Sequence, residues 1–330
     1  MTDIGMARLG WRRHLTRNPI VPIFLAFLVI ADVVSAGRFL QPANMVVILF
    51  QSSVVGVLVL GQTLVMLVAG IDLSIVATAV LAALIMGAAG SERQIMMDLS
   101  GFLPFLGFWQ SIVVALVVAA LIGFINGIAV VRLKIPAFIA TLAMSLALTG
   151  IGMLSTGGSP VHYPDAFYGA FGQTKVLGLP LPVYVFAVLA ALIAFVLGRT
   201  RFGVELYAIG GNPRASGLSG IPVGRVTIIT YTLCGLLGGI AGFLFLARTG
   251  SVSPTSGGGL LLSTVAAVVV GGVSLSGGRG SVLNAVVATL LLSGLSNLMN
   301  ILLVSPHLQD AVEGLIIVLA IMLNVRLERD

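Results

Sequence analysis

Long apolar runs follow one another along almost the whole chain, separated by short stretches that contain glycine, proline or a charged residue. A transmembrane helix needs about 20 consecutive apolar residues, and most of these runs come close to that length. The runs predict spans at residues 20–37, 45–69, 73–90, 109–131, 135–156, 180–198, 226–248, 261–276, 281–303 and 308–325. The pattern therefore predicts an all-α, polytopic membrane protein with about ten transmembrane helices.

The composition points to the same class of protein. Hydrophobic residues make up 58% of the chain and charged residues only 8%, and the mean hydropathy is +1.14. Soluble domains contain about 25% charged residues, so a soluble fold is excluded. The longest segment between predicted spans, residues 199–225, is shorter than the roughly 40 residues that a domain needs to fold without staples. We therefore expect a single transmembrane domain over residues 20–325.

The basic residues indicate which ends of the spans face the cytoplasm. With the N-terminus placed there, 13 of the 17 basic residues fall on the cytoplasmic side: Arg8, Arg12, Arg13, Arg17, Arg132, Lys134, Arg199, Arg201, Arg214, Arg225, Arg279, Arg326 and Arg329. The other four are Arg38, Arg93, Lys175 and Arg248. Lys and Arg accumulate in cytoplasmic loops, so both the N-terminal segment 1–19 and the tail 326–330 are predicted to be cytoplasmic. The same rule accounts for the net charge of +6 without a nucleic-acid partner.

One stretch, residues 61–90, is ambiguous. It fits either two spans that share a turn around Ala69–Asp72 or a single broken or re-entrant helix. Part of this stretch, 69–74, is echoed by 271–276, and the spacing of Gly, Asn and Pro in 123–136 is echoed in 294–306. Transporters often contain repeats with broken helices in matching positions. Short strings of this kind also recur by chance in a composition rich in Gly, Ser and Leu, so both readings remain open.

Residues 199–225 carry a local helix signal. Asn212 followed by Pro213 is typical of a helix start, since an N-cap precedes a residue whose φ is already set for the first turn. Gly220 and Pro222 then end the helix after about two turns. A helix this short is marginal alone in water, so we expect it to dock on a partner. The alternative is an ordinary connector that carries cytoplasmic arginines.

Four groups of residues occur in the same order as in a known family. They are Gly70–Ser74; Asn126–Gly127 with Ile135–Leu142; Thr200–Gly203, Tyr207–Asn212 and Ser219–Ile221; and Ala266–Gly272 with Ser274–Gly280. Together they resemble the permeases of ribose/xylose/arabinose-type ABC importers, over about residues 40 to 325. Family members usually carry an acidic pair where this chain has Leu261 and Ser263.

The resemblance implies the permease subunit of an ABC importer in the bacterial inner membrane. It implies assembly with a second permease, as a homodimer or a mixed pair, and with a cytoplasmic ABC ATPase that supplies the ATP hydrolysis. A periplasmic sugar-binding protein would deliver a small-molecule sugar, and lipid would surround the spans. The residues expected to couple to the ATPase are Arg201, Phe202, Gly203, Gly210, Gly211, Asn212, Pro213, Arg214, Ser219 and Gly220. Pentose, hexose, autoinducer-like and nucleoside substrates are all compatible with the same scaffold.

Polar side chains within or beside the spans are candidates for the translocation pathway, since a neutral sugar needs hydrogen-bonding groups without trapped charge. We expect these to be Asp72, Ser74, Asn126, Thr141, Ser274, Asn297 and Asn300. Ser, Thr and Asn also link membrane helices to one another, which is the alternative role for each. A carboxylate such as Asp72 is costly within a bilayer and raises a second hypothesis, a proton-coupled secondary transporter that works without an ATPase.

Enzymatic chemistry has little support in the sequence. The three histidines, His14, His162 and His307, are scattered, and Cys234 is the only cysteine, so we predict no catalytic, metal or cofactor site. The string Leu275–Gly278 has the letters of the ABC ATPase signature. However, the chain lacks the phosphate-binding G-x-x-x-x-G-K-[ST] loop, so we interpret this string as a tight glycine turn.

Overall fold

A computed structural model describes residues 20–88, 108–162 and 166–329. The predicted cytoplasmic segment 1–19 lies outside the described residues. The helices are α2 (Ile20–Val34), α3 (Pro42–Leu67), α4 (Ile75–Ala88), α5 (Phe108–Val131), α6 (Ala137–Thr156), α7 (Ala166–Gln173), α8 (Leu181–Arg199), α9 (Arg201–Gly211), α10 (Pro213–Leu218), α11 (Val223–Thr249), α12 (Gly258–Val270), α13 (Val282–Ile301) and α14 (Pro306–Arg329). Two antiparallel ladders of two-residue strands complete the described fold: β1 (Val161–His162) with β4 (Ser251–Val252), and β2 (Lys175–Val176) with β3 (Leu179–Pro180).

Six helices in the described part of the chain are long and apolar enough to cross a membrane: α3, α5, α6, α8, α11 and α13. The all-α, polytopic prediction agrees with this architecture. Three further predicted spans correspond to α2, α4 and α12, which are apolar but only 15, 14 and 13 residues long. The predicted span 261–276 ends later than α12, because apolar counting passes through Gly271, before which the helix stops. The last two residues of the predicted span 73–90 lie outside the described part of the chain.

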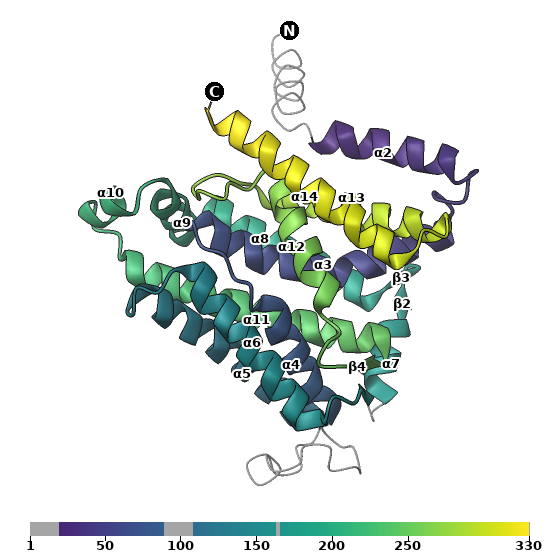
Figure 1. The fold of residues 1–330 in the computed structure, drawn as a ribbon, viewed down its shortest axis with the longest axis horizontal. Coiled ribbons are helices and arrows are strands. Elements are labelled where there is room, and N and C mark those ends of the chain that lie inside the picture. The colour runs from purple at the N-terminus through teal and green to yellow at the C-terminus, as the bar shows by residue number, and fades with distance from the viewer. Residues whose placement is uncertain (1–19, 89–107, 163–165, 330) are drawn as a thin grey trace.

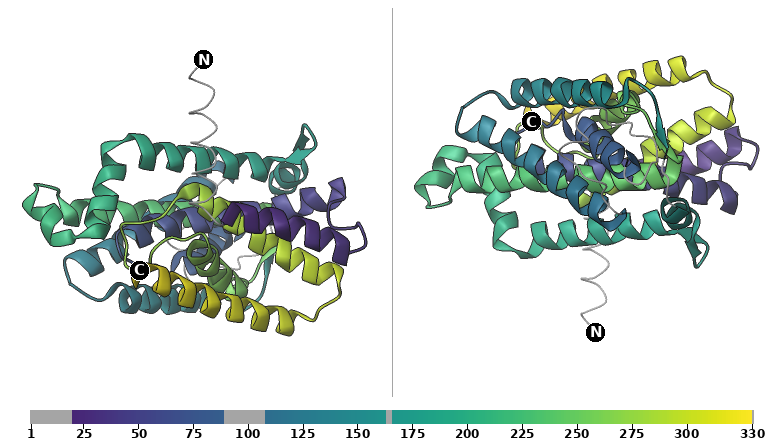
Figure 2. Two further views of the ribbon diagram at one scale, coloured as in Figure 1. Left: turned by 90° about the horizontal axis from the view of Figure 1, so that it is seen from above. Right: turned by 90° about the horizontal axis from the view of Figure 1, so that it is seen from below.

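The core of the bundle lies where α11 packs between α4 and α5. Gly238 and Gly242 face the backbone carbonyls of α4, and Gly235 and Gly239 face α5, so a side-chain carbon at any of the four would meet the neighbouring helix. Small residues at such contacts let membrane helices approach closely. In the views of Figure 2, α8 lies on one long side of this core, and α6 and α14 lie on the other.

In the described part of the ambiguous stretch, residues 61–88, the chain breaks between two helices. Helix α3 ends at Leu67, Ala69 adopts a φ of 59°, and α4 begins at Ile75. Gly70 donates a backbone hydrogen bond to Val65 O at 3.0 Å, which closes the end of α3. Non-helical backbone inside a membrane domain is tolerated only where protein covers it, and this break is largely buried.

The two internal echoes lie at similar places in the order of helices. The string 69–74 lies between α3 and α4, and 271–276 follows α12 in the connection to α13. In the second pair, 123–136 runs from α5 to the start of α6, and 294–306 runs from α13 to the start of α14. The order of helices is therefore compatible with a structural repeat for both echoes.

The two ends of the bundle differ. Helices α9 and α10 lie at one end, and α7 with the β2–β3 hairpin lies at the opposite end (Figure 1). The long helices α8 and α11 run between these ends. The chain from Thr200 to Pro222, which contains α9 and α10, projects at the end opposite α7.

Candidate functional site: a buried polar cluster and a projecting segment

Four predicted pathway residues meet at the break between α3 and α4, and we call Asp72, Ser74, Asn126 and Thr141 the Asp72 cluster. The exposed fraction of Asp72 is 1%. Its Oδ1 accepts two hydrogen bonds from Ser74, one from the backbone N–H at 2.8 Å and one from the hydroxyl at 2.6 Å. The carboxylate thus satisfies one backbone N–H in the break between the two helices.

Asn126 and Thr141 attach this break to two other helices. The Asn126 amide on α5 donates to Ser74 Oγ at 2.8 Å. On α6, Thr141 Oγ1 accepts from the backbone N–H of Leu73 at 3.1 Å and donates to Ala137 O at 2.8 Å. All four side chains of the cluster are buried. The Asp72 cluster therefore adds polar contacts between the start of α4, α5 and α6.

Tyr231 and Cys234 of α11 lie beside the cluster, and the sequence reasoning did not assign them to it. Both are fully buried. A side-chain carbon at Gly70 would lie 2.5 Å from the Tyr231 hydroxyl, and one at Gly61 would lie 3.4 Å from Cys234 Sγ. The glycines of α3 and of the break are therefore what allow α11 to reach the cluster.

The other three pathway candidates lie elsewhere. Ser274 belongs to the loop between α12 and α13, where its Oγ accepts from the backbone N–H of Ser276 at 3.1 Å. Asn297 accepts from the amide of Asn44 on α3 at 3.0 Å, and Asn300 accepts from Gln309 on α14 at 2.9 Å. Both asparagines therefore link helices, the alternative role considered for them.

An acidic residue does occur near the position where the family pattern led us to expect a pair. Ser263 on α12 donates a hydrogen bond of 2.6 Å to Glu313 Oε2 on α14. The carboxylate that α12 lacks is thus supplied by a neighbouring helix, since α12 and α14 pack together.

The projecting segment consists of two helices, of which the sequence predicted one. Asn212 Oδ1 accepts from the backbone N–H of Ala215 at 3.0 Å and Pro213 is the first residue of α10, so the predicted helix start is confirmed. Gly220, with a φ of +84°, follows the helix. Helix α9 was not predicted, although Thr200 is an N-cap residue and Arg201 with Glu205 has i, i+4 spacing.

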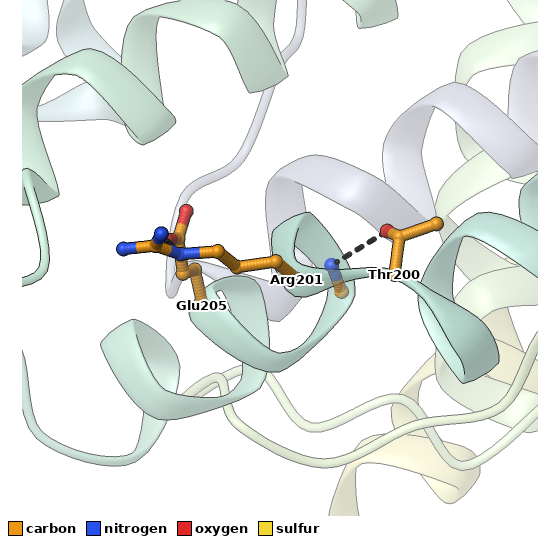
Figure 3. A network of polar contacts seen from close by, with 4 residues as sticks. Thr200, Arg201 and Glu205 are labelled. Atoms are coloured by element: carbon orange, nitrogen blue, oxygen red, sulfur yellow. Dashed lines mark hydrogen bonds and ion pairs between the residues drawn. The ribbon is translucent and has the colours of Figure 1, made fainter.

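Figure 3 shows how α9 begins. Thr200 Oγ1 accepts from the backbone N–H of Gly203 at 3.4 Å, and Arg201 Nε lies 2.9 Å from Glu205 Oε1. The Arg201 side chain is 86% exposed, so this ion pair is open to solvent on one side. It contributes little to stability, since exposed pairs typically contribute less than about 1 kcal/mol.

The predicted coupling residues divide into two groups by burial. Phe202 packs against the core, and Gly203 and Gly210 are buried. The exposed group is Arg201, Gly211, Asn212, Pro213, Arg214, Ser219 and Gly220. Leu218, which the sequence reasoning did not select, ends α10 with 91% of its surface exposed. Helix α9 thus packs the segment against the bundle, and most of α10 is exposed to solvent.

Tyr207 on α9 is a further residue that the sequence reasoning did not assign. Its hydroxyl donates to the backbone carbonyl of Gly280 at 2.9 Å. Burial raises the pKa of the Tyr207 phenol above its usual value, so the hydroxyl keeps its proton at neutral pH and remains a donor. This bond ties α9 to the loop between α12 and α13.

Comparisons with known proteins place this architecture in a family. The family described as branched-chain amino acid transport system / permease component matches residues 44–321. The ribose import permease protein RbsC of Escherichia coli (strain K12) is 37% identical over 325 residues, covering 95% of this chain and 96% of the relative. The fructose import permease protein FrcC of Rhizobium meliloti is 35% identical over 314 residues, covering 93% and 84%. The L-arabinose transport system permease protein AraH of Escherichia coli (strain K12) is 36% identical over 200 residues, covering 61% of each chain. No solved structure matches the chain.

These relatives confirm the resemblance drawn from the four groups of residues, because they carry the names of sugar permeases and two of them align with most of the chain. The matched family also covers the region from α3 to α14 that contains the Asp72 cluster and the projecting segment. The chain therefore belongs to the branched-chain amino acid transport system / permease component family.

Proposed function

We propose that this chain is the membrane-spanning permease subunit of an ATP-driven sugar importer in the bacterial inner membrane. It would act as one of a pair of permeases, a homodimer or a mixed pair, with a cytoplasmic ABC ATPase and a periplasmic sugar-binding protein. The names of the relatives, which are ribose, fructose and arabinose permeases, support a monosaccharide as substrate. The distribution of basic residues supports ten spans with both termini in the cytoplasm.

The exposure of α10 is the observation that carries this proposal. A six-residue helix is marginal in water, yet α10 projects from the end of the bundle with Leu218 almost fully exposed. A partner that covers this apolar tip would remove the cost of leaving it in water. Arg201, Arg214 and Arg225 lie on the same segment or beside it, which supports a cytoplasmic location, where an ATPase would bind.

The buried polar groups support transport of a neutral solute. Binding and hydrolysis of ATP in the partner would move α9 and α10, and the helices that follow them would tilt to open the pathway to one side and then the other. The amide of Asn126 and the hydroxyl of Thr141 are groups that a sugar hydroxyl can bind once the helices part. Asp72 would hold the break in one geometry during this movement.

Reconstitution tests the proposal directly. The chain is purified with its ATPase, inserted into lipid vesicles and supplied with the binding protein and radiolabelled ribose, fructose or arabinose. We expect ATP-dependent uptake of one of these sugars. Asn212→Arg combined with Arg214→Glu should abolish association with the ATPase and leave the protein folded in the membrane. Arg132→Glu, which changes an exposed arginine in the α5–α6 connection, is the matched control and should keep the association.

The rival hypothesis predicts a different energy source. A proton-coupled secondary transporter would move the solute in vesicles that lack any ATPase when a pH gradient is applied, and Asp72→Asn would reduce that flux. Uptake of this kind, without stimulation by ATP, would contradict the proposed function.

A further inference from the structure

The string Leu275–Gly278 lies in a tightly closed loop, and we call residues 274–280 the glycine loop. The backbone N–H of Ser274 donates to Arg279 O at 2.9 Å, which closes the loop on itself. Gly277 and Gly278 adopt φ values of +85° and +71°, a region that side chains other than glycine rarely enter. The expected glycine turn is therefore present, and its glycines are required by the backbone.

The glycine loop is bonded to the end of α3. The N–H of Gly278 donates to Leu67 O at 3.0 Å, and Leu67 is the last residue of α3. The last carbonyls of a helix have no partner within the helix, so the loop satisfies one that would otherwise be unpaired. A side-chain carbon at Gly277 would lie 2.8 Å from the backbone N of Ala69, so the loop also touches the break itself.

The same loop is bonded to α9. Gly210 is packed so closely that a side-chain carbon there would collide with both Leu67 O and Gly278 N. Three residues earlier, the Tyr207 hydroxyl donates to Gly280 O. The end of α3, the glycine loop and the last turn of α9 therefore meet backbone to backbone, and the Tyr207 side chain adds one hydrogen bond.

This junction lies between the two regions described above. Gly210 is two residues before Asn212, the cap of α10, and Leu67 is five residues before Asp72. We propose that the glycine loop is a clasp that transmits movement of α10 to the Asp72 cluster, with Tyr207 and Gly210 as its positioning residues. The inference rests on the proposed function, because it assigns the path by which an ATPase would act on the membrane helices.

Backbone contact is what makes the clasp stiff. Long side chains can change rotamer and absorb a displacement, whereas close-packed backbone groups have no such freedom and transmit it. A movement of α9 must therefore displace Leu67 and the break together, or break the bonds to the loop. Loss of one of these bonds should weaken transmission without removing the surface that binds the ATPase.

The test compares the number of sugar molecules imported per ATP hydrolysed in reconstituted vesicles. Tyr207→Phe removes one hydrogen bond and no bulk, and its matched control is Tyr184→Phe, which removes a hydroxyl that donates to Val176 O at the opposite end of the bundle. Gly210→Ala inserts a carbon into the junction, and its control is Gly198→Ala, where a carbon meets open space. We expect Tyr207→Phe to lower the ratio about fivefold, the effect of losing one hydrogen bond in the transmitting state. Gly210→Ala should lower it further, and both controls should match the wild type.

The binding and hydrolysis of the ATPase are measured on the same samples. The clasp requires that the Tyr207→Phe protein keeps its ATPase bound and hydrolysing while uptake falls. An unchanged ratio in Tyr207→Phe would overturn the clasp, and so would loss of the ATPase from that variant, since Tyr207 would then serve docking. Absence of ATP-driven uptake in the wild type would instead refute the proposed function on which the clasp depends.

Discussion

The Asp72 cluster and α10 both use a side-chain oxygen that accepts from a backbone N–H nearby in the sequence, but in opposite surroundings. In the cluster, Asp72 Oδ1 accepts from the backbone N–H of Ser74, and at the start of α10, Asn212 Oδ1 accepts from the backbone N–H of Ala215. The first bond is buried among α4, α5 and α6, whereas the second is exposed at the end of the bundle. The comparison shows that burial, rather than the bond itself, decides what such a cap contributes.

Burial changes the consequence of losing a partner. A backbone N–H that loses its acceptor inside the protein cannot turn to water, so the full desolvation cost remains. At the surface, water replaces the lost acceptor and the cost is smaller. Changes in the Asp72 cluster should therefore appear mainly as loss of stability, and changes in α10 mainly as loss of association.

The largest expected effect comes from breaking the buried side of this comparison. Asp72→Ala leaves the N–H and the hydroxyl of Ser74 without their acceptor, and we expect the free energy of unfolding to fall by about 3 kcal/mol. Thermal unfolding of the purified protein in detergent measures the change. Asp72→Asn keeps an oxygen that can accept the backbone bond and should cost clearly less. Equal losses in the two variants would show that the charge, rather than the acceptor, stabilises the break.

The next effect tests the exposed side. Leu218→Asp places a charge on the tip of α10, and we expect the affinity for the ATPase to fall about 30-fold, as for an interface hot spot, with no change in thermal unfolding. Binding of the purified ATPase to the permease in detergent gives the affinity. Leu177→Asp is the control, because Leu177 is 93% exposed but lies in the hairpin at the opposite end. A similar loss with Leu177→Asp would contradict the assignment of α10 as the docking element.

These two regions also differ in how much of them could be predicted from the sequence. The start and end of α10 follow from neighbouring residues, since Asn212 caps its own helix and Gly220 follows it, so local rules suffice. The members of the Asp72 cluster were selected as polar residues in apolar surroundings. That they meet could not be predicted, because Asn126 and Ser74 are 52 residues apart and the bond depends on tertiary packing.

Asn297 and Asn300 also show that the partners of a side chain could not be predicted from the sequence. Their i, i+3 spacing places them on one face of α13, which made a shared role reasonable. In the structure each bonds to a different helix, Asn297 to α3 and Asn300 to α14. Spacing along a helix predicts which side chains point the same way, but the neighbouring helices decide what each one contacts.

A third effect compares a buried and an exposed residue among the predicted pathway residues, Asn126 and Asn300. Asn126→Ala removes the donor to Ser74 Oγ inside the cluster, and we expect the free energy of unfolding to fall by about 1.5 kcal/mol. Asn300→Ala removes a comparable side chain at an exposed bond to Gln309 and should change it by less than about 0.5 kcal/mol. Both values come from thermal unfolding under identical conditions. A larger loss for Asn300→Ala would mean that the link between α13 and α14, rather than the Asp72 cluster, holds the bundle together.

The smallest effect concerns the ion pair at the start of α9, in which one side chain is exposed and the other is largely buried. Glu205→Gln removes the charge that faces Arg201 but keeps the size of the side chain, and the pair is open to solvent on the Arg201 side. We expect the free energy of unfolding to change by less than about 0.5 kcal/mol, and that change to shrink further at high salt, because exposed pairs are screened. Thermal unfolding at low and high salt measures both. Arg201 and Glu205 both lie in α9, so a larger, salt-independent loss would show that Glu205 acts through a contact that salt does not screen. The contacts of Phe202, Gly203 and Gly210 indicate that packing holds α9 to the bundle.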